Sequence, residues 1–525
     1  MTQASSTTDK SGWPTALVAL ALLAWLACTA WMRPLAVPDE GRYAGVAWEM
    51  IRSGDWLTPT LNGLPFFHKP PLFYWLTALS IKAFGLTLWA ARLASVLGAL
   101  AGALAVHMLA KRWAGPRLAG WSTLVLVTQP FWFGGAQYAN LDMLVAGCIS
   151  AAIAFAAHAV LAREAGRPFR LALYGAYAFA GLGLLAKGLI GLVLPGAVIV
   201  VWLLLGGRWR AVLGLLSLPG MAVLAVVAAP WFVAMQRLYP DFFHYFFVYQ
   251  HFQRFTQTGF NNMHAWWYYL PLIVGLSLPW VPAWMAAVCW PGKAPRVSDA
   301  ASAPPDSGQA LRLLMWVWMG VIVVFFSIPA SKLPGYVLPA LPPLAWLVAD
   351  ALLCRWPRGA WGLPALAGLA AVLCVGLIAV AVQVRQAVDP APRCPCCSRC
   401  SSRACRWSMS TASSTTCLST WGSRRTHPHG QRLGRPHAAP ARQRPQGAVR
   451  RGRVQPRAGK AGARVQGRLD ALAVTHPRPG RDGAARCDAA LPRVGLATAR
   501  EKVQAVVAVE VLDRDDLLAK GLHCQ

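Results

Sequence analysis

The stretch "VPDEGRY", from Val37 to Tyr43, places two carboxylates and a guanidinium directly after the apolar run "TALVALALLAWLACTAWM". Charged groups at the end of a membrane helix are costly, so they need a reason. Asp39 and Glu40 are candidate catalytic carboxylates, which could orient or deprotonate an acceptor hydroxyl. The alternative is structural: Glu40 or Arg42 caps a helix or forms a salt bridge that supports Asp39.

Two further stretches combine a cation with prolines and aromatic residues. In "FFHKPPLFYW" the Pro-Pro sequence stiffens the backbone beside Lys69, and a fixed cation at headgroup level suits a lipid-borne phosphate. In "FFSIPASKLPGYVLP" Lys332 and Tyr336 can both donate hydrogen bonds to phosphate oxygens. The alternatives are a snorkelling lysine for Lys69 and an aromatic-belt tyrosine beside a tight turn for Tyr336.

The segment 242–271, "FFHYFFVYQHFQRFTQTGFNNMHAWWYYLP", is dense in aromatic side chains. Aromatic faces suit sugar rings and isoprenoid chains, and Arg254 could neutralise a phosphate. An amphipathic helix embedded in the membrane interface is the alternative interpretation. His68 and His251 are weak candidate metal ligands, because no H-x₃-H spacing supports them. The sequence therefore predicts no certain cofactor and leaves a divalent metal open.

The elements that must position these residues are membrane helices. The chain has 525 residues, of which 56% are hydrophobic and 13% charged, whereas a soluble protein carries about 25% charged residues. Apolar runs near the ~20 residues of a bilayer span recur from residue 14 to residue 384. The first run lacks an A-x-A-like cleavage site and is expected to be a retained helix. Helices are predicted at about 14–32, 87–110, 118–138, 141–162, 171–187, 189–206, 211–233, 266–290, 312–328, 334–352 and 360–384.

Basic loops set the expected orientation, because short cytoplasmic loops are enriched in Lys and Arg. Five basic connections, beginning with "KRWAGPR" and "REAGRPFR", fall on one side by parity, together with an N-terminal segment 1–13. That side is predicted to be cytoplasmic. Residues 71–84 are then an amphipathic helix along the outer interface rather than a span. Loops 33–86 and 234–265 are expected on the periplasmic face, with the candidate site residues.

The last part of the chain has a different composition. Residues 394–525 contain no Phe, Tyr, Ile or Asn, and they contain 21 Arg but only 3 Lys. Such a segment has little to bury, and no apolar period persists in it until its last residues. Its Cys cluster lacks a second pair at zinc-finger spacing, and its basic residues lack the aromatic interleaving of an RNA-binding tail. Out-of-frame translation from near residue 394 is the preferred interpretation, with a disordered basic tail as the alternative.

Five motifs in order resemble one family. They are "PDEGRYAGVAWEM", "GDWLTPTLNGLPFFHKPPLFYW", "AARLASVLGAL", "LLAKGLIGLVLP" and "SKLPGYVLP". Together they resemble the membrane glycosyltransferases that use polyprenyl-phosphate sugars, in the branch of protein mannosyltransferases and lipid A aminoarabinose transferases. The resemblance covers residues 14–384. It implies an all-α polytopic membrane protein of GT-C type, with about 11–13 transmembrane helices and a catalytic cavity at the outer face.

The resemblance also implies roles for individual residues. Asp39 would be the acceptor-side carboxylate, Lys69 and Tyr336 would hold the carrier phosphate, and Arg254 would assist them. The aminoarabinose branch often has an acidic residue where this chain has His68, so the sugar and a metal site there stay open.

The expected activity follows from these roles. A sugar would pass from undecaprenyl phosphate to lipid A or protein in the bacterial inner membrane, with membrane lipids but no nucleic acid as partners. A transporter or flippase of a lipid-linked substrate is the rival class, and a non-catalytic scaffold is the third.

Overall fold

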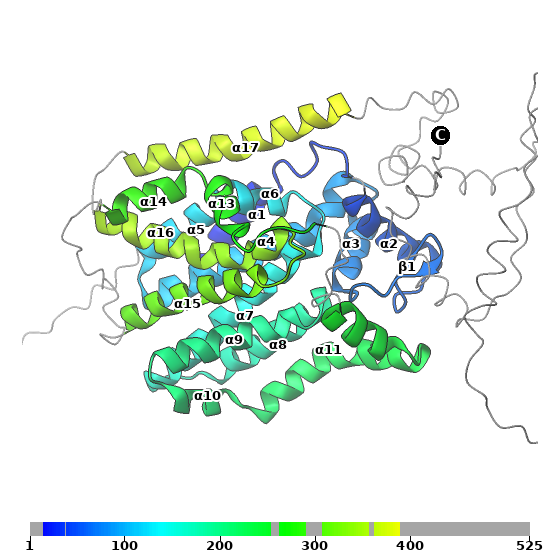
Figure 1. Cartoon of the computed structure of the whole chain (residues 1–525), viewed down its shortest axis with the longest axis horizontal. Helices are drawn as coiled ribbons and strands as arrows, with labels where there is room; N and C mark the ends of the chain where they lie inside the picture. Colours follow the sequence, from blue (N-terminus) through cyan, green and yellow to red (C-terminus); the bar gives the residue numbers. More distant parts are fainter. Residues whose placement is uncertain (1–13, 37, 254–261, 290–306, 356–361, 389–525) are drawn as a thin grey trace, which may run out of the picture. The chain divides into compact units, whose positions relative to one another are not determined.

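The computed structural model describes residues 14–36, 38–253, 262–289, 307–355 and 362–388. The predictions for residues 1–13 and 394–525 lie outside the described residues. The described chain is almost entirely helical (Figure 1). Its elements are α1 (Thr15–Ala27), α2 (Asp39–Ser53), β1 (Thr60–Leu61), β2 (Leu64–Pro65), α3 (Leu72–Phe84), α4 (Leu88–Trp113), α5 (Pro116–Val127), α6 (Pro130–Ala136), α7 (Leu141–Glu164), α8 (Arg170–Lys187), α9 (Ile190–Leu205), α10 (Trp209–Leu215), α11 (Leu218–Leu238), η1 (His244–Gln253), α13 (Tyr269–Leu276), α14 (Trp280–Cys289), α15 (Ser307–Ser327), η2 (Pro334–Ala340), α16 (Leu341–Arg355) and α17 (Gly362–Val388).

The helices confirm the prediction of a multi-pass membrane protein. In the part of the chain that the structure describes, six helices are long and apolar enough to cross a membrane, or seven if α13 and α14, bent by 99°, form one broken span. Helices α1, α3 and α9 are apolar but shorter, with at most 17 residues. Length and composition thus assign fewer spans than the 11–13 expected. Two expected spans are also divided: prolines begin a new helix at Pro130 and at the first turn of α11, since proline suits a helix N-terminus.

The centre of the bundle is the pair α4 and α7, which pack against each other along their length. A methyl group on Gly147 would overlap the Gly98 carbonyl, and one on Gly98 would overlap the backbone at Leu144. Glycine therefore permits this close backbone approach, as small residues do between membrane helices. Helix α7 is buried over most of its surface, whereas α17 is largely exposed and runs along the edge of the bundle in Figure 1. Exposed apolar surface of that kind suits contact with lipid tails.

Residues 33–86 were expected to form an outer loop with one helix, and they contain two helices and a hairpin. The prediction of a helix at 71–84 is confirmed by α3, whereas α2 was missed. The strands β1 and β2 pair antiparallel around Asn62 and Gly63, both with positive φ. The Glu49 carboxylate of α2 accepts hydrogen bonds from the backbone N–H groups of Asn62 (2.6 Å) and Gly63 (3.1 Å). The hairpin that precedes Lys69 is thereby fastened to the helix that begins at Asp39.

Candidate active site

The carboxylate of Glu40 is fully buried and accepts five hydrogen bonds. Arg92 donates from Nε (2.9 Å) and Nη2 (3.1 Å), and Arg33 donates from Nη1 (2.5 Å). The backbone N–H groups of Ala36 and Ala139 donate the other two, both at 2.7 Å. Burial opposes ionisation, but the two guanidinium groups and the Ala139 N–H outweigh it and hold the Glu40 pKa below its ordinary value. Glu40 is therefore an ionised anchor that joins α2 to α4 and to the start of α7.

This geometry favours the structural alternative for Glu40 over the predicted catalytic role. Its oxygens are occupied by protein donors and have no exposed surface, so they cannot contact a substrate. The structural alternative weighed from the sequence fits instead. Asp39, the preceding residue, keeps 47% of its side chain exposed. It pairs with Arg42, with 3.9 Å between Nη2 and Oδ1, a weak surface pair.

Tyr43 lies one helical turn after Asp39. Its ring packs against Phe73 and Tyr74 of α3, with centroids 5.8 and 6.2 Å apart. Burial raises the Tyr43 pKa above its ordinary value, and the nearby carboxylates of Asp142 and Asp39 add to the increase. The Tyr43 hydroxyl thus stays protonated and lies within electrostatic reach of two carboxylates.

Three elements meet next to Tyr43. Asp142 is in the first turn of α7 and forms an ion pair with Lys187, the last residue of α8. The Lys187 ammonium also lies 4.1 Å from the centroid of the Tyr336 ring in η2. A side chain at Gly335 would overlap the Asp142 carboxylate, so glycine lets η2 approach α7 this closely. We call Asp39, Tyr43, Asp142, Lys187 and Tyr336 the Asp39–Tyr336 cluster.

Lys332 is buried and hydrogen-bonded to the backbone instead of being open to a phosphate. Its side chain is 2% exposed, and its ammonium donates to the backbone carbonyls of His264 (3.0 Å) and Pro329. Its backbone N–H donates to the Asn262 carbonyl at 3.0 Å, and the Tyr269 hydroxyl donates to Leu333 at 3.1 Å. Lys332 thus joins the turn before η2 to the segment before α13, and these contacts favour a structural role over the predicted binding of the carrier phosphate.

The remaining candidates are placed in part. Lys69 is half-buried and lies between the hairpin and α3, whose first turn contacts Tyr43. The His68 ring stacks on Phe66, with centroids 4.4 Å apart. Arg254 and the side chain of His251 lie outside the described residues. Within the described ranges, no three His, Cys, Asp or Glu side chains come together as a metal site.

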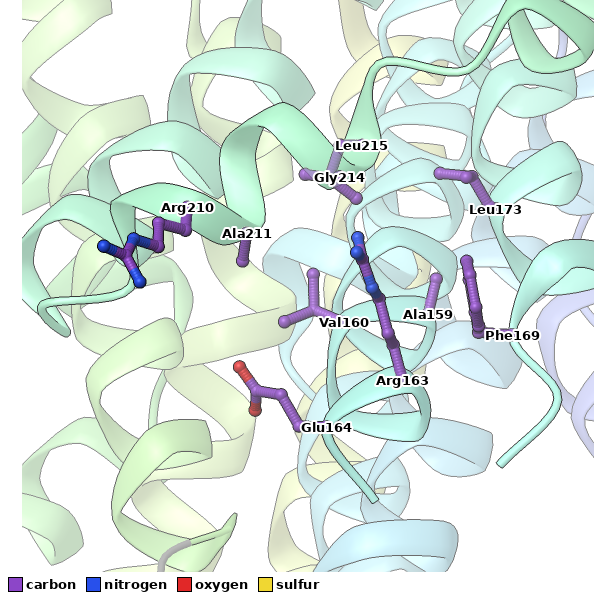
Figure 2. Close-up of a pocket in the computed structure, with 10 residues that line it drawn as sticks. All are labelled: Ala159, Val160, Arg163, Glu164, Phe169, Leu173, Arg210, Ala211, Gly214 and Leu215. Carbon is purple, nitrogen blue, oxygen red and sulfur yellow. The ribbon is translucent and has the colours of Figure 1, made fainter. Parts of the chain in front are cut away.

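A separate cavity lies at the other end of α7. Figure 2 shows it between the end of α7, the start of α8 and α10, with the Arg163 guanidinium next to Gly214. Its volume is about 290 Å³. Asp142 begins α7 and Arg163 is near its end, so about 30 Å of helix separates this cavity from the cluster. The cavity is not part of the candidate active site.

Comparison with known proteins assigns the fold and the family. Residues 68–235 match the family described as dolichyl-phosphate-mannose-protein mannosyltransferase. An undecaprenyl phosphate-alpha-4-amino-4-deoxy-L-arabinose arabinosyl transferase from Pseudomonas savastanoi pv. phaseolicola is 33% identical, over 70% of this chain and 68% of its own length. The chain belongs to the polyprenyl-phosphate-sugar glycosyltransferases. A similarly named Pseudomonas fluorescens (strain Pf0-1) protein is 33% identical over 64% of this chain, which spans only 60% of that relative.

The solved structures give the same family. ArnT from Cupriavidus metallidurans bound to undecaprenyl phosphate superposes with a TM-score of 0.55 at 34% identity, over 72% of this chain and 65% of that one. The apo structure of the same protein gives a TM-score of 0.53. The chain therefore has the GT-C fold, and that prediction is confirmed.

Sequence reasoning missed two parts of the candidate site. Arg92 stands in the quoted motif "AARLASVLGAL", and a charge inside an apolar run was a signal for a buried partner. Asp142 and Lys187 are 45 residues apart, and nothing in the sequence pairs them. Only the packing of α7 against α8 brings them together.

Proposed function

We propose that this glycosyltransferase transfers a sugar from undecaprenyl phosphate, or a related polyprenyl phosphate, to an acceptor such as lipid A or protein. The relatives are named as aminoarabinose transferases that use undecaprenyl phosphate, which supports the donor. The observation that carries the proposal is the Asp39–Tyr336 cluster, where the charges of half-exposed Asp39 and of Asp142 both act on the Tyr43 hydroxyl. Asp142 is in turn ion-paired with Lys187, whose ammonium lies over the Tyr336 ring. Such a site offers a base for the acceptor and donors for a leaving phosphate.

The proposed reaction is a single displacement. Asp39 orients the acceptor nucleophile and takes its proton while the acceptor atom bonds to the sugar C1. The bond from C1 to the phosphate oxygen breaks at the same centre, and the carrier phosphate leaves with the electron pair. Lys69 and Tyr336, with Arg254 as a third donor, stabilise the charge that develops on the phosphate. The lipid phosphoester supplies the energy, so no nucleotide is needed.

The surrounding residues would hold this geometry. Lys187 fixes the face of the Tyr336 ring, and Asp142 fixes Lys187. Tyr43 is a further donor near Asp39. Glu40 holds Arg33 and Arg92, Lys332 holds backbone carbonyls, and both stay outside the chemistry.

The positive-inside pattern supports the sidedness of the site. Helix α7 begins at the cluster and ends in the basic segment "REAGRPFR", so the cluster and the basic loops lie at opposite ends of one helix. We therefore place the active site at the periplasmic face of the bacterial inner membrane, with the N-terminus in the cytoplasm.

The test is transfer of radiolabelled sugar from the polyprenyl phosphate in membranes that contain the full chain. Lys69→Ala should abolish labelled product, and Lys82→Ala on α3 is the control, since that lysine is exposed and packs over Trp56. If the Lys69→Ala variant transferred sugar as fast as the unmodified chain, the assignment of Lys69 to the phosphate site would be wrong. Movement of the labelled lipid across the membrane with no glycosylated product would instead favour a flippase. Identification of the labelled product as lipid A or protein would name the acceptor.

A further inference from the structure

An apolar groove of about 520 Å³ lies between α1, α4, α7 and the start of α8. Ala105, Leu109, Ala154 and Phe155 form its walls. Its mouth is polar and lies at the ends of α4 and α7 remote from the Asp39–Tyr336 cluster. We call it the α4–α7 groove.

The buried indole ring of Trp113 contacts several polar side chains around the mouth of this groove. Trp113 is 1% exposed and donates from Nε1 to Nδ1 of His158 at 3.0 Å. The guanidinium carbons of Arg112 and Arg167 lie 5.3 and 5.9 Å from the centroid of the Trp113 indole. Arg112 and His158 also line the groove, together with Lys111. Three side chains from three segments are thus positioned around one rigid platform.

The hydrogen bond from Trp113 determines what His158 can offer. Nδ1 accepts the indole proton, so the neutral ring carries its own proton on Nε2. His158 therefore presents a donor rather than an acceptor at its other nitrogen. A neutral histidine donor beside an arginine and a lysine matches an oxyanion.

The charge around the mouth is strongly one-sided. The loops 111–117 and 163–170 contain six basic residues and a single acidic residue, Glu164. That carboxylate is already paired with Arg208, with 3.2 Å between Oε2 and Nη1. The mouth of the groove consequently attracts anions.

The flanks of the groove are apolar and exposed. Met108 is 51% exposed and Leu171 is 86% exposed, and both line it. In a membrane protein such side chains contact lipid tails rather than water. An apolar channel with a cationic mouth at the end of membrane helices is the arrangement that binds anionic lipid headgroups.

We propose that the α4–α7 groove binds an acidic phospholipid of the leaflet opposite the active site. Arg112, Lys111 and His158 hold the headgroup phosphate, and an acyl chain lies along Leu109, Ala154 and Phe155. The proposal is independent of the glycosyltransferase reaction, because no residue of the groove belongs to the Asp39–Tyr336 cluster.

Native mass spectrometry of the purified full chain with added phosphatidylglycerol tests this site. Each cation near the membrane surface contributes about fivefold to the binding of an acidic lipid, so Lys111→Gln with Arg112→Gln should weaken retention about 25-fold. Arg112→Lys should keep most of it. Arg237→Gln at the far end of α11 is the matched control and should retain lipid as the unmodified chain does.

A second variant separates the headgroup from the chain. Ala154→Trp fills the groove without changing its charge and should also reduce retention. Circular dichroism and gel filtration of each variant check that it is folded. Equal retention of phosphatidylglycerol by the double variant, or equal retention of phosphatidylcholine by the unmodified chain, would overturn the proposal.

Discussion

The ammonium group of Lys187 lies 4.1 Å from the centroid of the Tyr336 ring while it is ion-paired with Asp142. A cation over an aromatic face contributes about 0.5–2 kcal/mol and restricts the ring to one orientation. Asp142, Lys187 and Tyr336 come from α7, α8 and η2, so the contact locks three elements at one point. The hydroxyl of Tyr336 is thereby given a fixed direction.

Tyr336→Phe keeps the ring contact with Lys187 and removes only the hydroxyl. If that hydroxyl stabilises the leaving phosphate, sugar transfer should fall about 100-fold in kcat. Protein stability should be unchanged, because the aromatic face is retained. Kinetics in membranes with a labelled donor measure the first effect, and thermal denaturation in detergent measures the second. A Phe variant with undiminished kcat would exclude the hydroxyl from the reaction.

Asp39→Asn and Glu40→Gln should have opposite consequences although the residues are adjacent. Asp39→Asn removes the proposed base from a half-exposed position, so transfer should be lost and stability retained. Glu40→Gln leaves Arg33 and Arg92 without their buried counter-ion, which should lower the free energy of unfolding by about 3–5 kcal/mol. Parallel activity and unfolding measurements distinguish them. If the Asp39→Asn variant unfolds as readily as the Glu40→Gln variant, the division of roles is contradicted.

The Glu40 ion pair should also make stability depend on pH. The pKa of Glu40 is lower in the folded chain than its ordinary value of 4.5. Its contribution is therefore complete above about pH 4.5 and is lost as pH falls toward the folded-state pKa. Unfolding curves measured from pH 7 to below pH 4.5 should show this loss of stability in the unmodified chain. In the Glu40→Gln variant the free energy of unfolding should change less steeply with pH.

Gly147→Ala should weaken the packing of α4 on α7. The added methyl group overlaps the Gly98 carbonyl, and such overpacking costs about 1–3 kcal/mol. Gly196→Ala in α9 is the matched control, since a methyl group there meets no atom within 4 Å. Thermal unfolding of both variants in detergent is the measurement; equal stability of the two would show that the helices can separate without cost.

Lys332→Met should affect structure more than donor binding. The change removes hydrogen bonds to the His264 and Pro329 carbonyls and leaves both oxygens buried. We expect a loss of about 1–3 kcal/mol in stability with little change in the KM for the lipid donor. A large rise in that KM with unchanged stability would restore Lys332 to the phosphate site.

The sequence predicted the apolar helices well because each is a long local pattern. Helix α7 was expected at 141–162 and spans Leu141–Glu164, and α4 was expected at 87–110 and spans Leu88–Trp113. Helix α2 was missed although its local pattern is helical, because the segment was treated as a loop between membrane spans. Its buried positions recur at Glu40, Ala44, Ala47 and Met50, and Gly54 ends it in the left-handed conformation.

The sequence predicted individual residues of the candidate site but not the contacts between them. The expected positions of Asp39 and Tyr336 agree with a common cluster, but the roles of Glu40 and Lys332 depended on which groups they contact. Glu40 differs from Asp39 because Arg33, the Ala139 N–H and Arg92, which lies 52 residues later, all bind its carboxylate. A buried partner at that separation is a property of the folded chain.

The adjacency of Asp39 and Glu40 has a mechanical consequence. Helix α2 is short and begins at the residue proposed to contact the substrate. Without further contacts it could move easily under load. Glu40 transfers any force on that residue to Arg92 in the most deeply packed pair of helices. The carboxylate proposed as the base thus has the stiffness of the protein core while half of its side chain remains exposed.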